Sequence, residues 1–377
     1  MNLRLVVSAA ALLLCGCQTL SSWAPSWFPS IPTPSFAWLG FGHSSKPGPM
    51  PTLDAKASAH VNWQVPLGGK GGASFAPAVR ANVVYAAGPD GTIVSVDPAG
   101  GKPNWRVKAD KPLTAGVGAD QDVVIVGTAK GEVLAFDAAG KALWQAKISS
   151  EVAGPPAAAE GKIIVWSLDG KIFALNAADG SQKWVYQRTN PPLTVRRFAG
   201  GSISRGGLFT GTPGSVATPK GATELERIAD VTSTPVVEEK QVCAAAFQGR
   251  VACFEILRGT LLWSRDFSSL AGITLDNRYL YVTDDKGSIH ALDKSTGASV
   301  WKQDKLAARF PSGPVLVGDY LGVVDGEGYL HLLDRSDGNL VGRVATDGAS
   351  ALSRPIALGD AAVWQSTAGN LISASAR

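Results

Sequence analysis

The sequence has few of the residues that build metal, redox and hydrolytic sites. It contains four cysteines and four histidines among 377 residues, and no two cysteines are adjacent. It has neither a His-Glu-x-x-His motif nor a paired-cysteine metal spacing, and it lacks a Gly-x-Ser-x-Gly elbow and a phosphate-binding loop. We therefore expect no metal site and no catalytic nucleophile.

Clustered positive charge and helical periodicity are scarce as well. The net charge is +4, and no run of lysine or arginine occurs, which argues against nucleic-acid binding. No apolar period of 3.6 residues is sustained after residue 60. The chain is therefore not expected to contain a helical domain.

What the sequence does contain is glycine, tryptophan and a repeat. The stretches "ALNAADGSQKW" and "ALDKSTGASVW", which end at Trp184 and Trp301, share an Asp or Asn, a Gly and a final Trp at matched positions. Further copies end at Trp105, Trp144 and Trp263, and a copy without Trp ends at Gly342. Successive copies lie about 40 residues apart, apart from one interval of 79 residues, and such a fixed period indicates a repeat architecture.

Each period reads as a set of short antiparallel strands. In the copy ending at Trp301, "RYLYVTD", "SIHALD" and "ASVWKQD" read as strands, and "DDKG" and "KSTG" read as turns. Three or four short strands in about 40 residues make one blade of a β-propeller. The Asp holds the turn that contains the Gly, and the Trp brings its ring to a seam between blades, where its N–H finds a carbonyl. We therefore assign the repeated tryptophans a structural role.

The positions of the last strands predict eight blades. Trp63 lies 42 residues before Trp105, and a degenerate copy, "SVATPKGATELE", falls near Glu224. The segment after Gly342 has three strands of a blade, and the segment around Trp63 has the fourth. We expect an all-β, eight-bladed β-propeller over residues 60–377, with four antiparallel strands per blade and a ring closed by N- and C-terminal strands that share one blade.

The first 59 residues read as an export signal and a tether. An apolar run after Arg4 is short for a membrane span and predicts a signal peptide over residues 1–16. Leu14-Cys15-Gly16-Cys17 resembles a bacterial lipobox, which implies a lipid on Cys17; an ordinary secretory signal is the alternative. Residues 17–59 are rich in Pro and Ser and predict a tether, whose aromatic residues are either scattered or in contact with lipid headgroups or a partner.

The sequence also predicts structural roles for two cysteines and two histidines inside the repeats. Cys243 and Cys253 flank a short turn at near-mirror positions, so an oxidising compartment favours a disulfide, with two buried thiols as the alternative. His290 and His331 hold equivalent places in their repeats, which indicates strand positions rather than ligands.

The lipobox, the tether and the repeats together resemble the BamB family, lipoproteins of the outer-membrane β-barrel assembly machinery. "PPLTVRR" (191–197) and "ERIADVTSTPVV" (226–237) are similar to two neighbouring loops that in this family meet the POTRA domains of the barrel-forming subunit BamA. The resemblance implies partner-binding roles for Leu193, Val195, Arg196 and Asp230. The chain departs from the family pattern at Val195, where Leu is usual, and at Thr232, where a second Asp is frequent.

The resemblance implies a non-enzymatic scaffold, lipid-anchored at the periplasmic face of the outer membrane. BamA is the implied partner, and nascent outer membrane proteins are a further candidate. A quinoprotein-like redox enzyme and a cell-wall-binding propeller are the alternatives. The repeat also resembles that of quinoproteins, but those enzymes need adjacent cysteines over the cofactor and long covering insertions, and this chain has neither, so we expect no cofactor.

Overall fold

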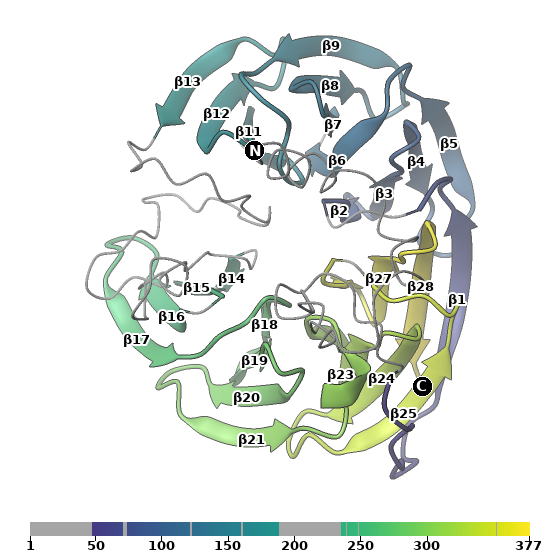
Figure 1. Cartoon of the computed structure of the whole chain (residues 1–377), viewed down its shortest axis with the longest axis vertical. Coiled ribbons are helices and arrows are strands. Elements are labelled where there is room, and N and C mark those ends of the chain that lie inside the picture. Colours follow the sequence, from purple (N-terminus) through teal and green to yellow (C-terminus); the bar gives the residue numbers. More distant parts are fainter. Residues whose placement is uncertain are drawn as a thin grey trace, which may run out of the picture. The chain divides into compact units, whose positions relative to one another are not determined.

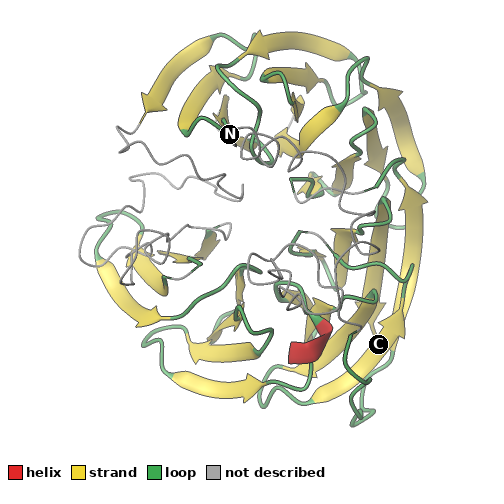
Figure 2. Cartoon of the chain, viewed as in Figure 1, coloured by secondary structure: helices red, strands yellow, loops and turns green. Residues whose placement is uncertain are grey.

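The computed structural model describes residues 47–70, 74–120, 123–159, 161–187, 235–238, 240–247, 249–351 and 353–377. These residues form four-stranded antiparallel sheets, and one 3-10 helix, η2 (Ala307–Arg309), lies between two of the sheets. The sheets are arranged radially, each with one edge strand near the centre and the opposite edge strand at the rim (Figure 1). Figure 2 shows that strands and the turns between them account for almost all of this unit.

Of the first four sheets, three precede residues 188–234 in the sequence and the fourth follows them. Each sheet is given from its inner to its outer strand. Their strands are β2 (Ala78–Arg80), β3 (Val83–Ala87), β4 (Thr92–Val96) and β5 (Pro103–Lys108); β6 (Leu113–Asp120), β7 (Val123–Thr128), β8 (Glu132–Phe136) and β9 (Ala142–Lys147); β10 (Ala157–Ala159), β11 (Lys162–Trp166), β12 (Lys171–Asn176) and β13 (Gln182–Gln187); and β14 (Val236–Glu238), β15 (Gln241–Ala245), β16 (Arg250–Glu255) and β17 (Leu261–Asp266).

The remaining sheets follow in the same order. Their strands are β18 (Ile273–Leu275), β19 (Tyr279–Thr283), β20 (Ile289–Asp293) and β21 (Ser299–Gln303); β22 (Val315–Val317), β23 (Tyr320–Val324), β24 (Tyr329–Asp334) and β25 (Leu340–Ala345); and β26 (Ile356–Leu358), β27 (Ala361–Gln365), β28 (Asn370–Ala376) and β1 (Ala59–Pro66).

Strand position within a blade follows the burial that the sequence permits. The middle strands are largely buried because both of their faces pack against neighbouring blades, as in β4, where all five residues are buried. The outer strands alternate, as in β5, because one face meets solvent. Each seam between two blades therefore contains its own apolar cluster, such as the one that joins Tyr281, Trp301 and Leu333.

The first and last strands of the propeller share one blade, as the sequence predicts. β1 pairs antiparallel with β28, and the register runs from Ala59 opposite Ala376 to Pro66 opposite Asn370. The backbone of Ser58 and that of Arg377 exchange two further hydrogen bonds. This expectation is confirmed, and the pairing covers an edge that each segment would otherwise expose.

The expected number of blades is wrong. The described residues form seven four-stranded blades, whereas the sequence analysis predicts eight. The count of eight divided the interval between Trp184 and Trp263 into two periods and placed a degenerate copy near Glu224. That copy lies in residues 188–234, outside the described residues. The other blades were identified by a Trp that recurs about every 40 residues. The sequence between Trp184 and Trp263 contains no Trp, so this criterion could not identify a further blade there.

Tryptophans of the outer strands join five of the seven described blades to the blade that follows. Trp301, for example, is buried against the blade that follows, and its indole N–H donates to the carbonyl of Arg335 at 2.9 Å. The acceptor always lies in the turn before the outer strand of the following blade. The equivalent donor–acceptor pairs are Trp63 with Pro98, Trp105 with Ala138, Trp144 with Ala177 and Trp263 with Lys294.

The glycine of the repeat is the seat for this tryptophan. A Cβ atom on Gly338 would lie 2.5 Å from Cε3 of Trp301, and its φ of +74° also favours glycine. The preceding Asp334 accepts a backbone hydrogen bond from Ser336 at 2.8 Å and so holds the turn. The repeated Asp, Gly and Trp are thus parts of one joint between blades, which confirms their predicted structural role.

One outer strand lacks the tryptophan, and the structure shows why. At Gly342 of β25 the backbone of residues 53–57 lies against the strand, and a Cβ atom on Gly342 would lie 2.7 Å from the carbonyl oxygen of Ala57. The following blade has no turn to receive a ring at this seam, because its outer strands are the two ends of the propeller, β28 and β1. The segment before β1 fills the place of the missing side chain.

Candidate functional site

The residues with predicted roles in binding and anchoring lie outside the described residues. Leu193, Val195, Arg196 and Asp230 fall within 188–234, and Cys17 falls within 1–46. The described chain leads into 188–234 from the outer strand β13 and resumes just before the inner strand β14. The candidate site is therefore characterised by the two blades that flank this stretch.

The outer strand of the first flanking blade is exposed along its whole length. All six residues of β13 are exposed, and the side chain of Trp184 is 43% exposed. Val185 and Tyr186 beside it are exposed to a similar extent. Among the described residues no carbonyl accepts from the Trp184 indole, unlike the buried Trp263 and Trp301 of the other blades.

The second flanking blade has a glycine turn on which no described tryptophan packs. Its turn before β17 contains Gly259, and no described residue lies within 4 Å of the position of a Cβ atom there. Leu257 in the same turn is 88% exposed, and Leu261 and Leu262 of β17 are also exposed. Contiguous exposed apolar residues mark interaction surfaces on soluble proteins. The sequence analysis treated Trp184 as equivalent to its counterparts and so missed this difference, which the interval of 79 residues signals.

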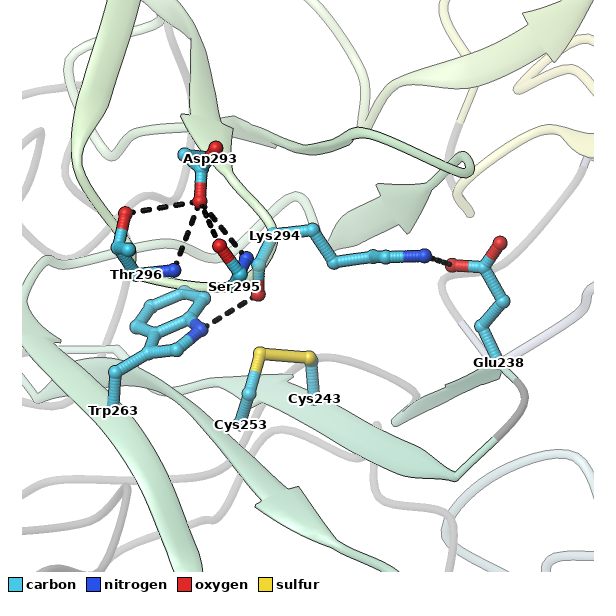
Figure 3. The surroundings of a disulfide bond; sticks show 8 residues. All are labelled: Glu238, Cys243, Cys253, Trp263, Asp293, Lys294, Ser295 and Thr296. Atoms are coloured by element: carbon cyan, nitrogen blue, oxygen red, sulfur yellow. Dashed lines mark hydrogen bonds and ion pairs between the residues drawn. A yellow bond between two sulfur atoms is a disulfide. The ribbon is translucent and has the colours of Figure 1, made fainter.

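A disulfide braces this second blade. Cys243 of β15 and Cys253 of β16 lie directly opposite each other in the register, with Cα atoms 4.1 Å apart, and the structure joins their sulfurs (Figure 3). Both residues are fully buried in an apolar cluster with Ile273 and Leu280 of the next blade. The cross-link therefore ties the two middle strands together in the blade that follows residues 188–234.

Polar contacts fix the same blade to its next neighbour. Figure 3 shows Trp263 donating to the carbonyl of Lys294 at 2.8 Å, while the Lys294 ammonium forms an ion pair with Glu238 of β14 at 3.0 Å. Arg265 donates to the carbonyl of Gly297 at 2.7 Å. The turn at Asp293 is held by hydrogen bonds from Ser295 and Thr296, which lower the pKa of Asp293 to about 2. The blade is thus rigidly held on one side and exposed on the other.

The two histidines of the repeats are structural. His290 and His331 lie on the equivalent strands β20 and β24, and each contacts an Asp, Asp284 and Asp325, at 2.9 Å. Burial raises the pKa of Asp325, but hydrogen bonds from His331, the Tyr329 backbone and Arg309 outweigh burial and hold that pKa below its usual value. Both groups of the Asp325–His331 pair are fully buried, so this pair holds the interior together and is not open to a ligand.

Sites for other chemistry are not found in the part of the chain that the structure describes. No group of three or more His, Cys, Asp or Glu side chains among those residues is placed to hold a metal ion. Over the same residues, no helix has the length and apolar character needed to cross a membrane.

The fold and its joints define a class, the β-propellers whose blades are fastened by a repeated Asp, Gly and Trp. Solved structures agree with the β-propeller fold. The crystal structure of BamB from Moraxella catarrhalis aligns with a TM-score of 0.73 at 23% identity and covers 84% of this chain and 99% of that one. A β-propeller domain of Cps50 (Swd1) from Myceliophteria thermophila aligns with a TM-score of 0.54 at 10% identity. At these identities the likeness concerns the fold alone.

The sequence comparisons define the family. The chain matches the family described as "Outer membrane protein assembly factor BamB" over residues 89–215, 213–303 and 285–377. It is 40% identical over 345 residues to the protein of that name from Nitrosomonas eutropha, covering 84% of this chain and 80% of the relative. It is 36% identical to the one from Bordetella pertussis, covering 73% and 76%. The chain belongs to the BamB family, and the resemblance inferred from its sequence is confirmed.

Proposed function

We propose that this protein is a lipid-anchored, non-enzymatic scaffold that assists outer membrane protein assembly by binding the POTRA domains of BamA. Membership of a family named for assembly of outer membrane proteins supports the process. The single observation that supports the location of binding is the exposure of apolar residues on β13 and beside Gly259, which flank in sequence the stretch that carries the predicted binding residues.

The side chains proposed to bind have complementary chemistry. Arg196 is suited to a planar, bidentate contact with a carboxylate or with backbone carbonyls of the partner. Asp230 is suited to accept from backbone N–H groups or from a lysine. Leu193 and Val195 would provide the apolar centre between these charges, as interface anchors commonly do.

The anchor is proposed on Cys17. Leu14-Cys15-Gly16-Cys17 ends an apolar run, and the Pro- and Ser-rich segment after it would connect the anchor to the propeller. The protein would then act at the periplasmic face of the outer membrane.

The partner proposal is tested by co-purification with BamA from detergent-solubilised membranes. The double variant Arg196→Ala, Asp230→Ala should lose co-purification and keep its melting curve, because these side chains would act on the partner and not within the propeller. A charge-matched control is Lys102→Ala with Asp360→Ala, two exposed positions on blades that do not flank residues 188–234, which should co-purify normally. A double variant that loses stability but binds normally once folded would show that the pair is structural.

The anchor proposal is tested by membrane fractionation. Cys17→Ala should leave the protein soluble or uncleaved, because the cysteine at the predicted lipidation position is lost. Normal outer-membrane fractionation of this variant would refute the assignment.

A further inference from the structure

Residues 47–58 form a strap across the outside of two blades. The strap begins beside η2, where the backbone N–H of Gly48 donates to the carbonyl of Ala308 at 2.8 Å. It ends beside β25, where the N–H of Asp54 donates to the carbonyl of Leu340 at 2.9 Å and that of Ala57 donates to the carbonyl of Val341 at 3.0 Å. The sequence analysis assigned these residues to the tether.

Two arginines hold carbonyl groups of the strap. Arg309 donates to the carbonyl of Gly48, and Arg343 donates to that of Pro51 at 2.9 Å. Arg309 is only 2% exposed and is fixed by ion pairs with Asp325 at 2.7 Å and Glu327 at 2.6 Å. This clamp belongs to the propeller and does not depend on the strap for its own position.

The strap itself is held less firmly than a strand. Pro49 and Pro51 have no N–H to donate, and most strap residues are exposed or half-buried. Leu53 packs against an apolar cluster of the β18–β21 and β22–β25 blades, and Ala57 packs against the next cluster. A segment with few buried apolar contacts opens locally at a lower free energy than the blade beneath it.

We propose that the strap detaches from and redocks on an intact propeller, so that the tether has two lengths. When the strap is docked, the free tether ends at Pro47. When it is detached, the free tether extends to Ala59 and gains up to about 40 Å of reach, at 3.3–3.6 Å per extended residue. Only this consequence for reach rests on the proposed lipid anchor; the detachment does not.

Trypsin reports the detachment, because the strap contains one cleavable bond. Lys46 is followed by proline and resists trypsin, whereas Lys56 is followed by alanine. The N–H groups of Lys56 and Ala57 both donate to the carbonyl of Val341, so the docked bond is protected. We expect the full-length protein in detergent to be cut slowly at Lys56 under native conditions while the propeller remains intact.

Two variants should accelerate this cleavage. A Cβ atom on Gly48 would lie 2.8 Å from Cβ of Ala308, so Gly48→Val should displace the start of the strap and speed cleavage about tenfold. Arg343→Gln removes the donor to Pro51 and should speed cleavage by a smaller factor. The matched control is Gly100→Ala, because nothing lies within 4 Å of the added methyl group and the cleavage rate should not change.

The outcomes separate the proposal from its alternative. The proposal is wrong if the wild-type protein is cut at Lys56 only in step with unfolding of the propeller, since the strap would then be part of the cooperative fold. It is also wrong if Gly48→Val and Arg343→Gln are cut at the wild-type rate. Cys17→Ala should show unchanged cleavage at Lys56, so a failure of the lipid-anchor proposal is distinguishable from a failure of this one.

Discussion

The joint between blades makes a quantitative prediction, because the described residues contain five glycine turns with a tryptophan packed on them and one, at Gly259, without. Gly338 has φ +74° and a Cβ atom there would lie 2.5 Å from the ring of Trp301. Gly259 holds the same place in its blade with φ +66°, and none of the residues that the structure describes lies within 4 Å of the equivalent position. Gly338→Ala and Gly259→Ala therefore differ in the steric contact but share the backbone strain.

The size of the difference follows from the two contributions. An alanine forced into the left-handed region costs about 1–2 kcal/mol in either variant. Pressing a methyl group into a packed ring costs about a further 1–3 kcal/mol, and this applies to Gly338→Ala alone. We expect free energies of unfolding lowered by roughly 2–5 kcal/mol in Gly338→Ala and by roughly 1–2 kcal/mol in Gly259→Ala.

Thermal unfolding followed by far-UV circular dichroism measures the difference. At roughly 2 °C per kcal/mol for a domain of this size, Gly338→Ala should melt about 2–6 °C below Gly259→Ala. In a Trp301→Ala background the added methyl group has room, so the difference between the two glycine variants should disappear. Equal melting temperatures in the wild-type background would refute the assignment of Gly338 as the seat of the ring.

Three further predictions test the candidate site and its braces. Trp263→Phe removes the donor to the Lys294 carbonyl and should cost about 1 kcal/mol, whereas Trp184→Phe should cost almost nothing, as paired chemical denaturation curves will show. Replacing Cys243 and Cys253 by alanine should cost roughly 2–3 kcal/mol, and thiol labelling of the unfolded, unreduced protein should find no free thiol at either position; two reactive thiols would contradict the disulfide. The pKa of Asp293, about 2 in the folded protein, lies below the usual value of about 3.9. Its contribution is therefore complete above about pH 4 and lost as the pH falls toward 2. Asp293→Asn should flatten that loss, and a carboxyl titration by NMR that finds a value near 4 would contradict it.

The joint between blades could be predicted from the sequence, because its Asp, Gly and Trp recur at fixed positions in each repeat. Asp334 and Gly338 shape one turn, and their periodic recurrence with a Trp identifies the turn, the outer strand and the seam without further information. The shared terminal blade was predictable for the same reason, since the Trp63 segment has the outer strand alone. Strand order within a blade follows directly from these elements.

The number of blades and the docking of the strap could not be predicted, because they depend on contacts between residues that lie outside the repeat pattern. The number of blades was inferred by dividing an interval that has no Trp, so the rule that gave the other blades did not apply between Trp184 and Trp263. The strap has no apolar alternation, and its prolines favoured the interpretation as a tether. Its docking depends on Arg309 and Arg343, about 260 and 290 residues away in the chain.

In a repeat protein, the positions at which the repeat is incomplete indicate surfaces that serve functions other than stability. A Trp without a seat and a seat without a Trp each leave apolar surface uncovered, which is unfavourable unless something else covers it. At Gly342 the exception is resolved within the chain, because the backbone near Ala57 occupies the place of the ring. At Trp184 and Gly259 no described residue does so, and the sequence between them carries Arg196 and Asp230. We therefore expect mutations at the exposed residues of β13 and of the turn at Gly259 to separate binding from stability most cleanly.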